Sequence, residues 1–200
     1  MLLAGCGVVD VHPSGPPIHS NTEWVLLPWL NRAEAPRVGE RLEPVLATLL
    51  RARGVEMVRR TPPLDAADQL PILDDDFRLA RAKEWALQEG IQYGVLGTIT
   101  EWRYKAGLDG EPAVGLSLEI VELATQRTVW SASGARAGWG RESLSGAAQK
   151  LLRELLEELE VTASAPAPAR EDLRVAAPAE ELTESRTEES NDSAAAENHE

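Results

Sequence analysis

The sequence is poor in the residues that build disulfides, metal sites and catalytic triads. It contains one cysteine, Cys6, so an internal disulfide is excluded. Its three histidines, His12, His19 and His199, lie near the ends of the chain, outside the stretch that carries periodic apolar residues. We therefore expect no Cys/His metal set and no serine–histidine pair in the folded body. No glycine-rich phosphate loop follows a strand either, so we expect neither a cofactor nor an enzyme.

Basic residues are also scarce. The chain has 33 acidic and 20 basic residues, which gives a formal net charge of −13. Such a chain repels nucleic acid and anionic lipid headgroups and attracts cationic polymers. Ten acidic but only three basic residues lie in 161–200, where Ala, Pro, Glu and Ser dominate without periodicity. We expect this acidic tail to be disordered, because it cannot bury enough apolar surface to offset its ordering entropy.

The first residues are similar to the lipobox of a bacterial lipoprotein. Leu3-Ala4-Gly5-Cys6 places small residues before a cysteine, where the signal is cut and the thiol is acylated. A basic start and a longer apolar stretch are missing, so we expect residues 1–6 to be the end of a longer signal. The alternative is a free cysteine in a cytosolic protein. The residue after the cysteine is Gly7 and not aspartate, the usual signal for retention in the inner membrane, so we expect the outer membrane. Residues 7–21 are rich in Pro, Gly and Ser, which is typical of a flexible tether.

Residues 22–160 carry the periodicity of one folded domain. Apolar spacing of 3–4 residues indicates helices, and alternation or short apolar runs indicate strands. The predicted order is β-α-β-α-β-β-β-α, an α/β fold in which helices pack on a mixed sheet. Strands are expected at Glu23–Pro28, Val55–Val58, Ile91–Tyr104, Val114–Ile120 and Thr128–Ala135, and helices at Val38–Arg53, Asp74–Glu89 and Leu144–Leu159.

Glycines and capping residues set the expected helix ends. Gly54 and Gly90 are expected to stop the first two helices. Pro44 suggests that the first regular helix begins only just before it. The aspartates 74–76 are expected to cap the second helix rather than bind a metal, because three adjacent residues at a helix start do not converge on one ion.

Two features of the domain invite a functional interpretation. Trp139 stands between two glycines in the connection before the last helix, where it is either packed under the domain or presented outward. The second feature is the turn between Tyr104 and Glu111. Ordinary turn chemistry explains its Asp and Gly residues, yet Lys105, Asp109 and Glu111 would project from its tip, where loops often carry function.

Two stretches of the chain resemble the PelC family, the outer-membrane lipoproteins of Pel exopolysaccharide secretion. They are WVLLPWLNRAEAPRVGERLEPVLATLL and EWRYKAGLDGEPAVGLSLEIVELATQRTVWSASGARAGWGRESLSGAAQKLLREL. The resemblance runs in order over residues 23–159, and the combination of YKAGLDGEP with GWGRESLSG is its specific part. The clipped signal and the acidic tail depart from the family pattern.

The resemblance implies an assembly and a role for three residues. It implies a closed homo-oligomeric ring, a dodecamer in the family, on the periplasmic side of the outer membrane beneath a β-barrel exporter. The ring would draw a cationic polysaccharide toward the exporter, because repetition around a symmetry axis pools weak charges into a strong field. Cys6 corresponds to the lipidated cysteine, Asp109 to the polymer-guiding carboxylate and Trp139 to the tryptophan that dips into the membrane.

Two other functions share parts of the pattern. The strand ending in Thr128-Val129-Trp130-Ser131 also resembles LpoB-like lipoproteins, which activate a peptidoglycan synthase, and CsgG-like secretion channels. An activator would be a monomer on a long linker. A channel would need membrane-spanning hairpins with lipid-facing alternation over about ten residues per strand.

Overall fold

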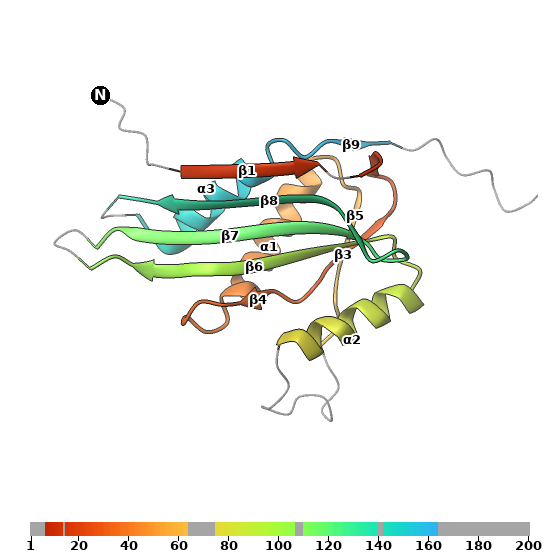
Figure 1. Cartoon of the computed structure of the whole chain (residues 1–200), viewed down its shortest axis with the longest axis horizontal. Helices are drawn as coiled ribbons and strands as arrows, with labels where there is room; N and C mark the ends of the chain where they lie inside the picture. Colours follow the sequence, from red (N-terminus) through yellow and green to blue (C-terminus); the bar gives the residue numbers. More distant parts are fainter. Residues whose placement is uncertain (1–6, 14, 64–74, 107–109, 140–141, 164–200) are drawn as a thin grey trace, which may run out of the picture. The chain divides into compact units, whose positions relative to one another are not determined.

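The computed structural model describes residues 7–13, 15–63, 75–106, 110–139 and 142–163, which belong to one compact unit. Helices and strands alternate in the middle of the chain, with short strands added at both sides (Figure 1). The elements are β1 Gly7–Pro13, β2 Ile18–His19, β3 Glu23–Leu26, β4 Leu30–Asn31, α1 Val38–Ala52, β5 Met57–Arg60, α2 Asp75–Gln88, β6 Tyr93–Tyr104, β7 Pro112–Glu122, β8 Arg127–Ala137, α3 Leu144–Leu155 and β9 Val161–Thr162.

A mixed sheet forms the centre of the fold, as the sequence predicted. Its strand order is β1-β8-β7-β6-β3-β5, and β4 pairs with β6 beside this path. β6, β7, β8 and β1 form an antiparallel meander, whereas β3 runs parallel to both β5 and β6. β2 and β9 form a separate parallel pair. The predicted order β-α-β-α-β-β-β-α is confirmed for β3 to α3, and β1, β2, β4 and β9 are additions to it.

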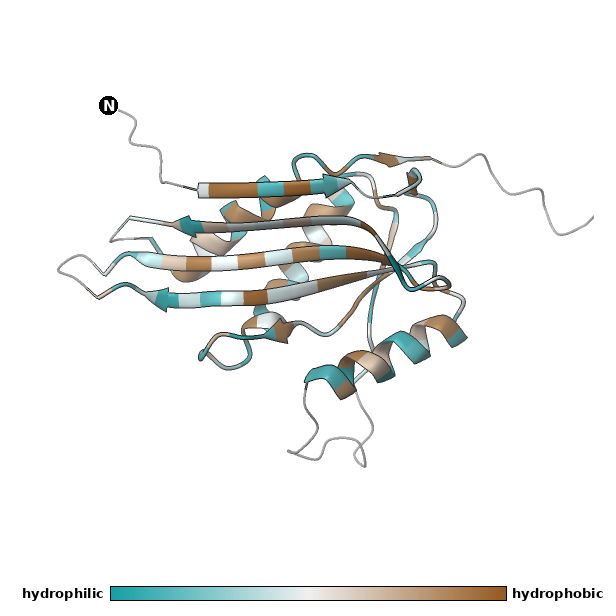
Figure 2. Cartoon of the chain, viewed as in Figure 1, coloured by the Kyte–Doolittle hydropathy of each residue, from teal (hydrophilic) through white to brown (hydrophobic). Residues whose placement is uncertain are grey.

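The helices cover the two faces of the sheet unequally (Figure 1). α1 and α3 pack on one face, where Leu46 and Leu151 contribute to the main apolar core together with Leu118 of β7. α2 buries Ala82 and Ala86 in a smaller core on β3 residues. The apolar stripes of β7 and of the helices in Figure 2 follow this division, because every second strand residue and every third or fourth helix residue faces a core.

The flexible tether predicted for residues 7–21 is wrong. Gly7–Pro13 is strand β1, which pairs antiparallel with the whole of β8 from Gly7↔Arg136 to Pro13↔Trp130. Val9 and Val11 pack against the main core, while Val8 faces solvent. The Pro- and Gly-rich composition suggested a linker, but the alternation of valines allows this segment to complete the otherwise open edge of β8. His12 and His19 therefore lie in strands β1 and β2, not outside the folded body.

The boundary at residue 161 also differs from the prediction. Val161–Thr162 forms β9, paired parallel with β2, so the ordered unit extends into the segment assigned to the tail. Residues 164–200, predicted to be disordered, lie outside the described residues.

Helix α1 begins earlier than Pro44 suggested. It starts at Val38 and carries Pro44 in its interior. Proline lacks the N–H that would bond the carbonyl four residues earlier, but Pro44 is exposed, so water can satisfy that carbonyl. The predicted stops are confirmed, because Gly54 (φ +96°) and Gly90 (φ +73°) both adopt the left-handed region just after α1 and α2.

Removal of Leu151 should strongly destabilise the domain. Leu151 is fully buried between α3 and the sheet. Leu151→Ala leaves a cavity in this core, so we expect the free energy of unfolding to fall by about 2–5 kcal/mol in urea denaturation. Leu87→Ala on α2 is the matched control, because Leu87 is 44% exposed. Equal losses in the two variants would contradict the assignment of the main core to the α3 face.

Candidate functional site at the two ends of the sheet

Strand register gathers three separate parts of the chain at one end of the sheet. Gly7 of β1 pairs with Arg136 of β8, which in turn pairs with Val114 of β7. Tyr104 of β6 and Pro112 of β7 pair at the same end and hold the connection between them. We call this end, on the left of Figure 1, the hairpin end. It unites the start of β1, the β6–β7 connection and the exit of β8.

Of the three predicted site residues, the structure describes one, and it lies at the hairpin end. Trp139 is described, whereas Cys6 and Asp109 lie outside the described residues. Their chain neighbours are placed: Gly7 follows Cys6 and begins β1, and Gly110 follows Asp109 just before β7.

Trp139 is presented outward. Its side chain is 52% exposed, which decides between the packed and presented alternatives left by the sequence. Gly138 donates its N–H to the carbonyl of Pro112 at 2.8 Å, which ties the residue before Trp139 to β7. A Cβ on Gly138 would collide with the Glu142 carboxylate and the Pro112 ring, so only glycine allows this close approach. The backbone just before the exposed indole is therefore held against β7.

Glu142 holds the other side of the Trp139 connection. Its backbone N–H donates to the carbonyl of Trp139 at 2.8 Å, and its carboxylate forms an ion pair with Lys150 at 2.8 Å. The bond from Lys150 is the main cause that lowers the pKa of Glu142, with a smaller contribution from the charge of Arg136. Ser143 then caps α3 by accepting from the N–H of Gly146 at 3.0 Å.

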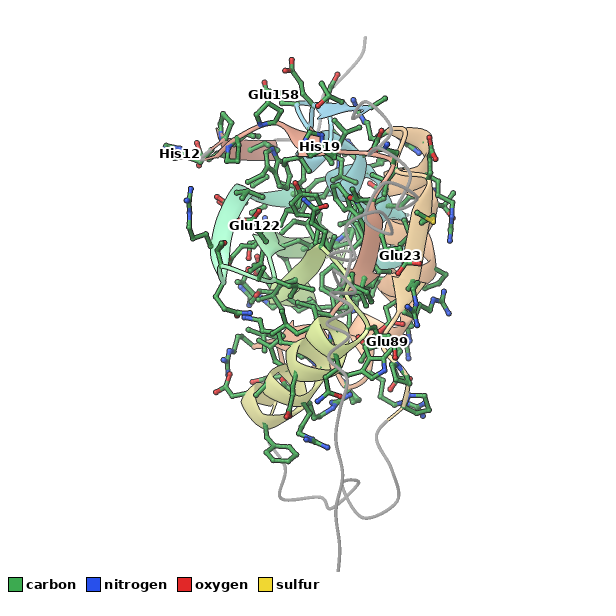
Figure 3. The ribbon with its side chains drawn as sticks, turned by 90° about the vertical axis from the view of Figure 1, so that its right-hand side faces the viewer. His12, His19, Glu23, Glu89, Glu122 and Glu158 are labelled. Atoms are coloured by element: carbon green, nitrogen blue, oxygen red, sulfur yellow. The ribbon has the colours of Figure 1, made fainter. Side chains whose placement is uncertain are left out.

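The opposite end of the sheet is rich in carboxylates. We call it the acidic end; it holds Pro13, Glu23, Glu122 and Arg127, and it faces the viewer in Figure 3. Glu23, Glu89, Glu122 and Glu158 come from four different elements or connections, which is why no sequence motif joined them. Sequence reasoning noted the overall acidity but missed this grouping.

Among the described residues, Arg59 is the cation that pairs with two of these carboxylates. Arg59 forms ion pairs with Glu89 at 2.9 Å and with Glu23 at 3.4 Å, and its guanidinium lies 5.1 Å from the ring centroid of Trp85. The pKa of Arg59 is raised, chiefly by its bond to Glu89. Glu23 and Glu89 are thus partly neutralised, whereas Glu158 lies apart from them at the top of Figure 3.

The described residues contain no group of three or more His, Cys, Asp or Glu side chains that could hold a metal ion. Within the same part of the chain, no helix has the length and apolarity needed to cross a membrane.

Comparison with solved structures identifies the family. A single-residue variant of PelC from Paraburkholderia phytofirmans, crystallised as a dodecamer, is 34% identical, covers 78% of this chain and 100% of the relative, and superposes with a TM-score of 0.65. The PelC dodecamer in a second crystal form is also 34% identical, with 78% and 99% coverage and a TM-score of 0.64. The chain belongs to the PelC family. The predicted resemblance to this family is thereby confirmed.

More distant likenesses concern the fold alone. The lipoprotein GNA1162 from Neisseria meningitidis is 17% identical, covers 68% of this chain and 96% of its own, and has a TM-score of 0.51. No family model and no curated protein matches the sequence.

The Glu142–Lys150 pair predicts a specific pH dependence. The pKa of Glu142 is lowered in the folded protein. The pair therefore stabilises the native state above the unfolded glutamate pKa of about 4.3, and this stabilisation is lost as pH falls through the lower folded pKa. We expect Glu142→Gln to be less stable than the unmodified chain at pH 7, and the difference to shrink as the pH is lowered below the unfolded value of about 4.3, in urea denaturation at each pH.

Lys150→Met is the matched variant for this experiment. It removes the other partner, so it should abolish the same pH-dependent part of the stability, and the double variant should lose no more than either single one. Additive losses would show that the two side chains stabilise the protein independently.

Proposed function

We propose that this chain is a component of exopolysaccharide export. Acylated Cys6 anchors it to the periplasmic face of the outer membrane, copies assemble into a closed ring, and the ring guides a cationic polysaccharide toward a β-barrel exporter. The observation that carries the proposal is the 34% identity over the full length of a PelC chain that crystallised as a dodecamer. The remaining arguments come from the placement of charge and of the exposed tryptophan.

The hairpin end suits a membrane-facing surface. Because β1 is a strand of the sheet from Gly7 onward, an anchor at Cys6 would hold the domain close to the bilayer with this end toward it. Trp139 is exposed at the same end, and tryptophan favours the boundary between lipid and water. A single acyl chain binds membranes weakly, so the additional chains of a lipoprotein cysteine and an inserted indole act together.

Charge supports a cationic polymer as the cargo. The chain carries a net charge of −13, and glutamates from several elements gather at the acidic end. Fields from exposed charges decay within about 8 Å at physiological salt, so one subunit attracts a polymer weakly. A ring places equivalent carboxylates side by side around one axis and raises the local concentration of cations there. Asp109, next to Gly110 at the hairpin end, is the proposed guiding carboxylate.

The fold bears on the two alternatives. In a CsgG-like channel the β6–β7 hairpin would face lipid, yet Val114, Leu116 and Leu118 of β7 are buried in the main core, where β7 packs against α3. An LpoB-like activator differs in assembly rather than in fold. Native mass spectrometry of the acylated protein in detergent separates the two, because we expect a large ring for export and a monomer for activation.

Reversal of the charge at Asp109 should impair export. We expect Asp109→Lys, in a strain that lacks the native gene, to reduce secreted polysaccharide severalfold, since each ring then presents cations to a cationic polymer. Glu84→Lys on α2 makes the same charge change away from the hairpin end and should leave secretion intact. The ring mass should be unchanged in both variants. Normal secretion by Asp109→Lys would remove this residue from the proposed role.

Replacement of Trp139 should weaken membrane association without unfolding. Its exposed side chain makes Trp139→Glu tolerable to the fold, but a carboxylate does not enter the lipid boundary. We expect less protein to float with outer-membrane lipid vesicles, and Trp139→Phe to retain most of the binding. Circular dichroism should be the same for both variants. Equal flotation of the glutamate variant would show that the indole does not contact lipid.

A further inference from the structure

One face of the sheet has no helix on it over β1, β8 and β7. α1 and α3 lie behind these strands in Figure 1, and no described element lies in front of them. Val9 and Val11 pack on the main core, so the residues that alternate with them point to the other side. We call that side the outer sheet face. Strand register places three rows of side chains on it: Val8, Ala135 and Gly115; Asp10, Ser133 and Ser117; His12, Ser131 and Glu119.

The outer sheet face carries carboxylates around a hollow. A cavity of about 360 Å³ is lined by Asp10, His12, Glu119 and Thr128 together with serines of β7 and β8. Asp10 is exposed. Glu119 accepts from the hydroxyl of Thr128 at 3.2 Å, but it forms no ion pair with a described base. The side chains between these acids are small, so another surface can approach the sheet closely and place a long side chain in the hollow.

The opposite side of the domain is basic. Leu46 of α1 and Leu151 of α3 face the sheet, and the outward stripes of the two helices form a surface that we call the helix layer. Its exposed cations are Arg41, Arg51, Lys150 and Arg153. Lys150 is paired with Glu142, whereas the three arginines form no ion pair with a described carboxylate. Residues 37–60 hold six arginines and three glutamates, in a chain whose net charge is −13.

We propose that these two surfaces meet in the ring: the outer sheet face of one subunit packs on the helix layer of the next, an assignment that rests on the proposed function. A closed ring of more than two identical chains needs two unlike surfaces on each subunit, because every contact is head to tail. The sheet lies between the two surfaces named here, and their charges are opposite. An arginine of the helix layer would enter the hollow between Asp10 and Glu119.

The size of the outer sheet face suits such a contact. β7 and β8 are 11 residues long. Three strands of up to this length, about 4.8 Å apart, present about 500 Å² before the relief of the side chains is added, which is the same order as the roughly 800 Å² that each partner buries in a standard interface.

The direction of the strands gives every subunit the same orientation in this ring. The strands run from the hairpin end to the acidic end, so subunits that stack face to back place all hairpin ends at one rim. Gly7, next to the proposed anchor, and Trp139 would lie at that rim in each copy. Membrane attachment and ring closure would thus use different surfaces.

A second copy fits the outer sheet face better than a bilayer does. The two PelC relatives were both crystallised as dodecamers, so chains of this family do assemble with themselves. A lipid surface would have to accept Asp10 and Glu119, whose charges are costly to remove from water. Arginines of a neighbouring subunit would instead compensate these charges.

The test is native mass spectrometry of the acylated full chain in detergent. Ala135→Arg places a long cationic side chain on the outer sheet face, opposite the arginines of the next subunit, so we expect the ring to dissociate to monomers. Ala80→Arg makes the same substitution at an exposed alanine of α2 and should leave the ring mass unchanged. Circular dichroism should be the same for both variants. A complete ring formed by Ala135→Arg would overturn the proposal.

A second variant damages the other surface. Arg41→Glu/Arg153→Glu reverses two exposed charges of the helix layer and should also give monomers. Each variant keeps one intact surface, so a mixture of Ala135→Arg with Arg41→Glu/Arg153→Glu should form one-to-one heterodimers but no rings. A mixture that stays monomeric at concentrations where the unmodified ring is intact would show that these two surfaces do not pair.

These outcomes are separable from those of the export experiment. If the unmodified chain forms a ring and Ala135→Arg keeps it, the proposed function stands and this interface falls. If Ala135→Arg abolishes the ring while secretion is unchanged, the interface stands and the role of the ring in export falls. If the unmodified acylated chain is a monomer, the ring and its interface fall together.

Discussion

The backbone ladder between β1 and β8 is the interaction on which the arrangement of the molecule depends. It pairs all seven residues of β1, from Gly7 to Pro13, with consecutive residues of β8. The lipid anchor proposed at Cys6 would therefore be joined directly to a sheet strand that begins at Gly7, rather than to a free linker. The orientation of the domain at a membrane would then follow from strand register, because a slip of one residue would turn Val9 and Val11 out of the core.

The same ladder runs from one end of the sheet to the other, and the two ends carry different side chains. The hairpin end presents Trp139 on a support made by Gly138 and Glu142. The acidic end gathers glutamates whose only described cationic partner within the group is Arg59. An exposed indole at one end and a group of glutamates at the other give the domain the polarity that the proposed membrane-anchored, cation-guiding ring would need.

Local patterns predicted the centre of the fold well and its margins poorly. The alternation in β7, the stripes of α1 and α3, and the stops at Gly54 and Gly90 all depend on neighbours in sequence, and the structure confirms them. β1 and β9 are stable only because β8 and β2 lie beside them, so composition alone suggested a tether and a tail. The helix start predicted from Pro44 was wrong for a related reason. The free-energy cost of a proline inside a helix depends on whether water can reach the carbonyl that loses its partner, and the sequence does not show that exposure.

The sequence by itself determined the alternating order of the central elements, the acidic character, the single thiol and the motifs that place the chain in its family, since these depend on residue identity and spacing. Tertiary structure alone decided which segments share an end of the sheet, that Trp139 faces outward, and that Asp10, Ser133 and Ser117 lie in one row across three strands. Such groupings join residues tens of positions apart. Strand pairing and helix packing bring them together, and no short-range pattern encodes those long-range contacts.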